Sequence, residues 1–221
     1  MTKRLYVFAL AAGKAGTFSA AGHRIGFVKA DAVYAAVERL ETAPAVSEAA
    51  LRAQHAIVAR IAAKVDAILP ARFGSLVDTE ELERVVALRR QAIRDALDLV
   101  RGRAQMTVRL FEAEAAVPLA HAATAARSGT EYLQARREAA AGRALPLSVA
   151  EITAAVKDIV AAERSEPGQG RVAATIYHLV DRAAVDQYKK RLAGVPPRPD
   201  PQMISVSGPW PPYAFVPELW R

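Results

Sequence analysis

The sequence contains no cysteine, and this absence excludes several classes of protein. Disulfide-stapled scaffolds, zinc sites with thiolate ligands and thiol enzymes all need cysteine side chains. Aromatic residues are also few, at 6% of the 221 residues. The chain has no uncharged apolar run of about eighteen residues, so we expect no helix that spans a membrane.

Alanine is abundant, with 49 residues, and it has the highest helix propensity of all amino acids. Apolar residues make up 52% of the chain, but only 66 of them are larger than alanine. These 66 side chains are enough for one or two modest cores. Such an apolar content excludes a wholly disordered chain.

Basic residues outnumber acidic ones by 30 to 23, which gives a formal net charge of +7. Arginine dominates, with 23 residues against 7 lysines, and the basic residues are scattered along the chain. A nucleic-acid-binding surface is expected to show a basic patch or stripe instead. We therefore expect no nucleic-acid partner.

The first half of the chain combines strand and helix patterns. Residues 1–12 resemble the start of a signal peptide, but Gly13-Lys14 interrupts the apolar run, so a buried strand over 4–12 is favoured. A strand is also predicted over 24–29, and a helix with Asp31 as its N-cap over 31–40. Ser47 should cap a further helix, whose inward stripe runs from Leu51 through His55 to Ile68.

Further patterns complete this half. The segment 68–74 is predicted to be extended, Asp78 to cap a helix that ends at Gly102, and 105–111 to alternate as a strand. The order β-β-α-β-α-β favours a four-stranded sheet covered by helices, close to a ferredoxin-like sandwich over residues 1–120.

The second half, residues 121–221, is predicted to form a smaller α+β domain. Helices over 132–144 and 148–163 should pair as an antiparallel hairpin. A strand over 172–180 and a helix over 183–192 follow, then a proline-rich connector and a strand over 203–207. The fold class is therefore α+β with two small domains.

No catalytic, cofactor or metal site is apparent in the sequence. Gly13-Lys14-Ala15-Gly16-Thr17 lacks the spacing of a phosphate-binding loop, so we interpret it as a turn after a strand. His55 and His178 fit hydrogen-bonded core positions better than metal positions. The acidic residues at 80, 81 and 83 suit a helix start, where the helix dipole favours them.

The tail from Ser207 to Phe215 is unusual, because its prolines stiffen a segment that carries three aromatic residues. Two interpretations are open. The aromatic side chains cap the core of the second domain, which is favoured on physical grounds, or they form a surface that binds a partner.

Two segments resemble the gas vesicle GvpF/GvpL family. The tail is similar to the family's Gly-Pro-Trp-Pro-Pro-Tyr-x-Phe signature, and residues 68–75 are similar to its Val-Leu-Pro-Leu-Arg-Phe-Gly-Thr segment. Gln105 departs from the family, which usually has glutamate there. The motif residues, either structural or interacting, are Pro70, Arg72, Phe73, Gly74, Gly208, Pro209, Trp210, Pro211, Pro212, Tyr213 and Phe215.

This resemblance implies a minor, non-enzymatic accessory protein of gas vesicle assembly, located in the cytoplasm and at the vesicle. Its implied partners are the hydrophobic shell protein and other accessory proteins, and it implies no cofactor. The alternative is a regulator that binds a nucleotide or another small ligand, because ferredoxin-like domains host many binding functions. A pocket with convergent polar groups beside Lys14 or His55 would favour that alternative.

Overall fold

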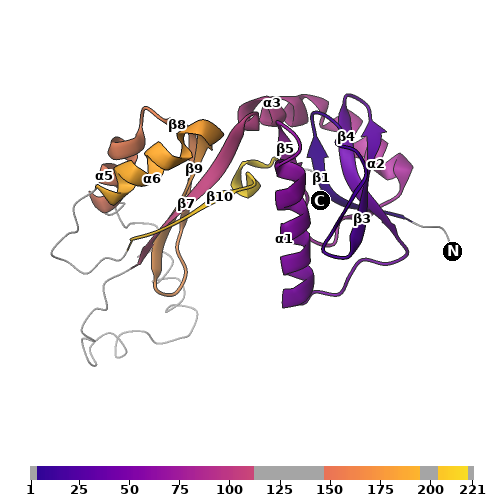
Figure 1. Cartoon of the computed structure of the whole chain (residues 1–221), viewed down its shortest axis with the longest axis horizontal. Coiled ribbons are helices and arrows are strands. Elements are labelled where there is room, and N and C mark those ends of the chain that lie inside the picture. Colours follow the sequence, from indigo (N-terminus) through magenta and orange to yellow (C-terminus); the bar gives the residue numbers. More distant parts are fainter. Residues whose placement is uncertain (1–3, 112–146, 195–203, 219–221) are drawn as a thin grey trace, which may run out of the picture. The chain divides into compact units, whose positions relative to one another are not determined.

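The computed structural model of the chain describes residues 4–111, 147–194 and 204–218 (Figure 1). Contacts within the chain divide it into two compact units. Unit 1 comprises Met1–Met106, Leu179–Arg182 and Gly208–Arg221, and unit 2 comprises Thr107–His178 and Ala183–Ser207. The mixture of helices with two sheets confirms the α+β class. The domain boundary near residue 120 falls outside the described residues and stays a prediction.

A curled sheet forms the centre of unit 1, with strand order β2-β3-β4-β1-β5, and β6 also pairs with β1. The neighbours of β1 run antiparallel to it. The strands are β1 (Arg4–Ala11), β2 (Phe18–Ala20), β3 (His23–Ala30), β4 (Val33–Leu40), β5 (Ile68–Pro70) and β6 (Leu76–Val77).

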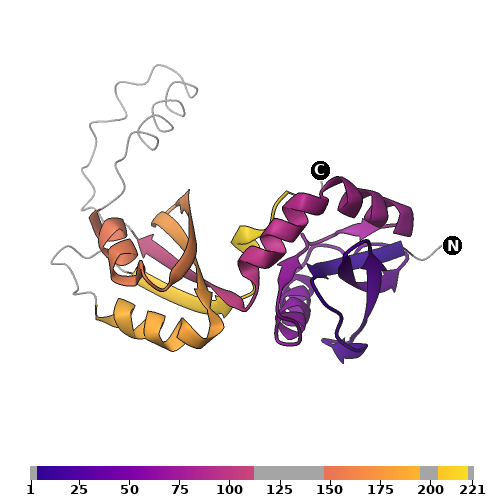
Figure 2. The ribbon, with the colours of Figure 1, turned by 90° about the horizontal axis from the view of Figure 1, so that it is seen from above.

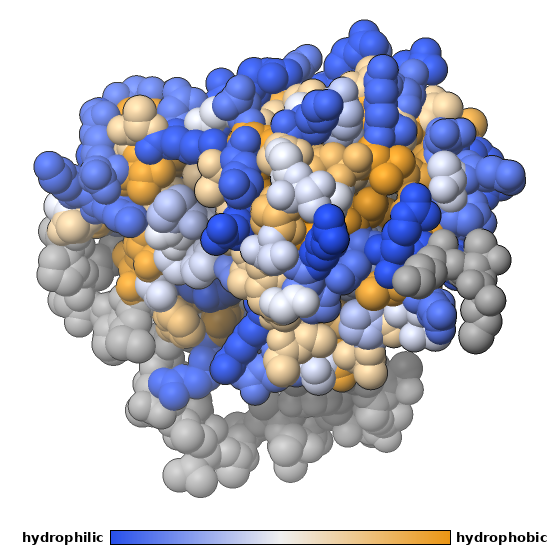
Figure 3. Space-filling view, turned by 45° about the vertical axis from the view of Figure 1, so that its right-hand side comes forward, coloured by the Kyte–Doolittle hydropathy of each residue, from blue (hydrophilic) through white to orange (hydrophobic). Residues whose placement is uncertain are grey.

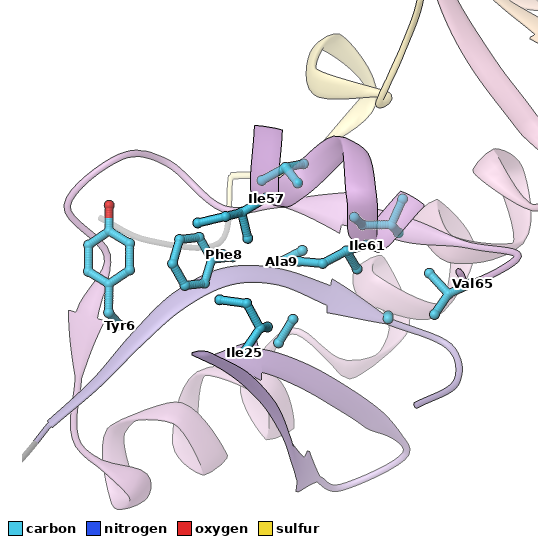
Figure 4. Packing of buried hydrophobic residues seen from close by; sticks show 11 residues of the cluster. Tyr6, Phe8, Ala9, Ile25, Ile57, Ile61 and Val65 are labelled. Carbon is cyan, nitrogen blue, oxygen red and sulfur yellow. The ribbon is translucent and has the colours of Figure 1, made fainter. Parts of the chain in front are cut away.

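Strand β1 lies in the core, because every side chain from Leu5 to Ala11 is buried. Helix α1 (Glu48–Ala62) packs against this strand through Ile57 and Ile61. Figure 4 shows these two isoleucines on α1 above Phe8 and Ala9. The predicted first strand is therefore confirmed, and the 13–17 stretch connects two strands rather than a strand and a helix.

The helix predicted over 31–40 is wrong, because these residues form the hairpin partner of β3. Ala30 pairs with Val33, so Asp31 and Ala32 form the turn. Asp31 has a φ of 51°, in the left-handed region that aspartate tolerates better than most residues. Strand β4 lies between β3 and β1 in the sheet, and this pairing overrides the helix propensity of its alanines.

Helix α1 begins as predicted, since the Ser47 side chain accepts a hydrogen bond from the Ala50 amide at 3.1 Å. It ends at Ala62, however, and Ile68 already belongs to β5. The buried face is also rotated from the predicted stripe: Gln54 is buried, His55 is half-buried, and Leu51 is 46% exposed.

The single helix predicted from Asp78 to Gly102 is divided at Arg89. Asp78 caps α2 (Thr79–Leu88) by accepting from the Glu81 amide at 2.7 Å, as predicted. Helix α3 (Arg90–Val100) follows, and Figure 2 shows the break between the two helices. Gly102 has a φ of 68° and introduces β7 (Arg103–Phe111), so the predicted glycine stop and a strand after it are confirmed. The alternation predicted for this strand is wrong, because Gln105 and Thr107 are buried as Met106 and Val108 are.

The second sheet has the order β10-β7-β9-β8. The segment 148–163 is helical only as far as Val156, in α5 (Leu147–Val156), and then becomes β8 (Val160–Pro167). Pairing with β9 (Val172–Asp181) overrides the helix propensity of Ala161 and Ala162. The predicted helix over 183–192 is confirmed as η1 (Arg182–Ala184) and α6 (Val185–Ala193).

The last predicted strand is confirmed but longer, since β10 spans Ile204–Trp210. The helix predicted over 132–144, and with it the helical hairpin, lies outside the described residues, as does the proline-rich connector. The ferredoxin-like assignment of the first domain is not confirmed.

The His178 side chain is fully buried in unit 2 and makes hydrogen bonds to two other polar side chains there. Its Nδ1 lies 2.6 Å from the Tyr188 hydroxyl and its Nε2 lies 2.9 Å from Glu163. Neutral histidine satisfies both contacts when Nε2–H donates to the carboxylate and Nδ1 accepts from the hydroxyl. The predicted hydrogen-bonded core histidine is confirmed.

We expect this cluster to make unit 2 sensitive to acid. Burial lowers the pKa of His178 below its ordinary value of 6.5, and the bond to Glu163 opposes this only in part. His178 therefore takes up a proton more readily in the unfolded chain than in the folded one. Its contribution to the free energy of unfolding is complete above pH 6.5 and is lost as the pH falls through the lower pKa of the folded state.

Hydrogen exchange of the β9 amides at pH 7.5 and 5.5, corrected for intrinsic rates, measures the effect. Protection of these amides should be lower at pH 5.5 than at pH 7.5 in the native chain, and His178→Gln should reduce this difference between the two pH values. The matched change His23→Gln, in unit 1, should leave it intact. An equal fall in the native chain and in His178→Gln would contradict the expectation.

Candidate functional site

Two segments far apart in the sequence meet in unit 1. Residues 70–72 and residues 213 and 216–218 line one pocket of about 170 Å³, which we call the motif pocket. The expectation that the tail caps the core of the second domain is wrong, because its described part from Gly208 onwards belongs to unit 1. In Figure 4 the tail, drawn in pale yellow, lies beside α1.

The first segment is held by polar side chains from β1 and α1. The Tyr6 hydroxyl donates to Gln54 Oε1 at 2.5 Å and accepts from the Gly74 amide at 3.1 Å. Gln54 Nε2 donates to the Ala71 carbonyl at 3.3 Å. Gly74 has a φ of 86°, which a residue with a Cβ adopts only under strain. The segment is therefore fixed by its backbone, and Phe73 packs edge-on against the Tyr6 ring.

The tail is anchored by buried groups on both sides of Tyr213. Pro211, Pro212 and Phe215 are buried, and the last of these is only 2% exposed. The Ala214 amide donates to Gln105 Oε1 at 2.8 Å. A glutamate could accept the same bond, so the neutral amide of Gln105 keeps this contact without burying a charge.

Four side chains around the tail leave apolar surface in contact with solvent, and we call this group the aromatic face. The His55 ring lies 5.3 Å from the Trp210 ring and 5.9 Å from the Tyr213 ring. Trp210 and Tyr213 remain 37% and 39% exposed. Leu51 lies one helical turn before His55 on α1 and is therefore its neighbour on the helix surface.

The hydroxyl of Tyr213 ties this side chain to α1. It lies 3.1 Å from His55 Nδ1, and burial raises the pKa of Tyr213 to about 12. The phenol therefore stays neutral at physiological pH and acts as a hydrogen-bonding anchor. This contact holds a side chain that remains partly exposed.

The structure brings together motif residues from both segments, Pro70 and Arg72 with Tyr213, in the motif pocket. Pro209 and Trp210 are exposed, whereas the following prolines are buried. Sequence reasoning did not single out Tyr6 and Gln54, which support the site from beneath. Their signal was weak, because Tyr6 is one residue of a largely apolar strand and Gln54 is one of several polar residues on an amphipathic helix.

The described residues offer surfaces for binding more clearly than groups for catalysis. No three histidine, aspartate or glutamate side chains among them come together as a metal site would require. None of the helices in the described ranges is both long and apolar enough to cross a membrane.

Two solved structures are similar to this chain over nearly its whole length. One is the gas vesicle protein GvpF from Anabaena sp. PCC7120, with a TM-score of 0.73 and 13% identity, which covers 98% of this chain and 99% of the other. GvpF from Microcystis aeruginosa has a TM-score of 0.67 and 13% identity, with 96% and 98% covered. At these identities the likeness shows a shared fold.

Among proteins with curated functional descriptions, none matches the sequence. The model of the family described as gas vesicle synthesis protein GvpL/GvpF matches residues 4–217, which includes both segments of the motif pocket. A match over almost the whole chain, together with the shared fold, shows the family: this protein belongs to the GvpL/GvpF family of gas vesicle synthesis proteins.

Proposed function

We propose that this protein is a minor, non-enzymatic accessory protein of gas vesicle assembly that holds hydrophobic shell subunits while the vesicle nucleates and grows. Membership of the GvpL/GvpF family supports a role in gas vesicle assembly. The shell protein and other accessory proteins are its proposed partners, and the cytoplasm and the vesicle its proposed locations.

The observation that carries the proposal is the aromatic face. It presents a tryptophan, a tyrosine and a leucine to solvent on a support that cannot easily rearrange. Such side chains bury large apolar areas at interfaces and lose little conformational entropy there. The face therefore suits the apolar surface of a subunit that would otherwise aggregate.

Exposed apolar side chains alone are not unusual, and on the face drawn in Figure 3 apolar residues reach the surface between hydrophilic ones. What distinguishes the aromatic face is that the His55 ring contacts both Trp210 and Tyr213, and that the tail is held by the bond from Ala214 to Gln105. Clustered patches mark interaction sites more often than single exposed residues do.

Co-expression of the tagged chain with the shell protein tests the proposal. We expect the shell protein to co-purify with the native chain and to stay soluble in its presence. Failure of the shell protein to co-purify would contradict the proposed function.

A further inference from the structure

The motif pocket contains a cationic side chain with no anionic partner among the described residues. The backbone of Arg72 is fixed, because its carbonyl accepts from the Ser75 hydroxyl at 2.8 Å and from the Ser75 amide at 3.3 Å. The side chain is exposed and lines the pocket, yet within residues 4–111, 147–194 and 204–218 it makes no hydrogen bond or ion pair. From the sequence alone, Arg72 is predicted to stand in a structural turn and to pair with a backbone carbonyl or a carboxylate, and among the described residues this pairing is absent.

The other charged residue of the pocket does not neutralise this guanidinium. Glu218 lines the same pocket and makes contacts of its own, but no ion pair joins it to Arg72 in the described structure. A guanidinium stays charged at any physiological pH, and its planar fork matches the two oxygens of a carboxylate.

The remaining lining of the pocket is mostly apolar. Pro70 and Ala71 are buried at its inner side, and Val216 and Pro217 line it from the tail. An occupant that matches both the guanidinium of Arg72 and the apolar lining must carry a carboxylate next to an apolar group. Clefts with an apolar lining and one or two placed polar groups are typical of specific binding sites.

We propose that the motif pocket binds an aspartate or glutamate side chain of the shell protein, flanked by apolar residues, with Arg72 as the group that pairs with the carboxylate. This inference rests on the proposed function and adds the chemistry of the contact. The aromatic face supplies apolar area, and the pocket supplies the orientation that a charge-assisted bond demands.

A zero-length cross-linker tests the pairing directly. A carbodiimide joins an amine to a carboxylate only when the two are in contact, so Arg72→Lys places a reporter amine in the pocket. Glu218→Gln is added so that the chain's own carboxylate cannot react. The control combines Glu218→Gln with Arg84→Lys, because Arg84 is an exposed arginine on α2 away from the pocket lining.

With co-expressed shell protein as the probe, mass spectrometry should find an amide between position 72 and a shell-protein Asp or Glu. We expect its yield to exceed that of the control about tenfold. Arg72→Gln should weaken retention of the shell protein about tenfold or more, as expected for the loss of a hydrogen bond to a charged group. Glu218→Gln alone should strengthen retention.

If the shell protein co-purifies but position 72 gives no cross-link above the control, the inference is overturned and the proposed function stands. If no shell protein co-purifies with the native chain, the proposed function falls, and the inference falls with it.

Discussion

Gly208→Ala is expected to lower the free energy of unfolding by about 3 kcal/mol or more, because strained backbone and overpacking act at the same position. Gly208 has a φ of 121°, which side-chain-bearing residues rarely adopt. A Cβ added there would lie 2.8 Å from the Gln105 carbonyl oxygen and 3.0 Å from Met106 Sδ. The first of these neighbours is backbone and cannot move aside cheaply.

The same change should also release the tail. Gln105 receives the Ala214 amide through its side chain, so a shift of its backbone weakens the anchor of the aromatic face. Urea denaturation followed by tryptophan fluorescence measures both effects. Gly26→Ala is the matched control in a strand, because its φ is ordinary and nothing lies within 4 Å of the added carbon. Equal midpoints for the two variants would contradict this account of Gly208.

Trp210→Ala is expected to reduce retention of the shell protein strongly while it lowers the free energy of unfolding only modestly. Since 37% of this residue is exposed, its loss should cost about 1–2 kcal/mol, less than the 3–5 kcal/mol typical of a fully buried aromatic side chain. The variant should therefore remain folded. It removes the largest side chain of the aromatic face, however, so retention of the shell protein should fall at least about tenfold, as for an interface hot spot.

Leu88→Ala is the control for this variant, because Leu88 is an apolar residue of α2 that is 77% exposed. It should retain the shell protein as the native chain does. Equal retention by Trp210→Ala and the native chain would show that the aromatic face does not bind shell protein. A large loss of stability would instead show that the ring mainly supports the core.

Parts of the fold could be predicted from local signals in the sequence. The caps Ser47 and Asp78 and the stop at Gly102 depend on neighbours within a few residues, and each is present in the structure. Helix and strand were confused where alanine is dense, over 33–40 and 160–163, because strand pairing there overrides local propensity.

The site itself depends on contacts between residues that lie far apart in the sequence, and local patterns do not predict such contacts. His55 meets Tyr213 across 158 positions, and Gln105 meets Ala214 across 109. The two motifs could be identified separately from their residues, but nothing in either indicates that both line one pocket. Periodicity placed His55 on a fully buried stripe, whereas it lies at the edge of that face, where the tail covers it in part.

The most direct test of the central claim is vesicle formation in a host strain that lacks only this gene. We predict that the strain forms no normal vesicles, that the native chain restores them, and that Trp210→Ala, produced at the native level and folded, does not. Normal vesicles in the deletion strain, or full rescue by Trp210→Ala, would contradict the claim that this protein presents shell subunits through its aromatic face.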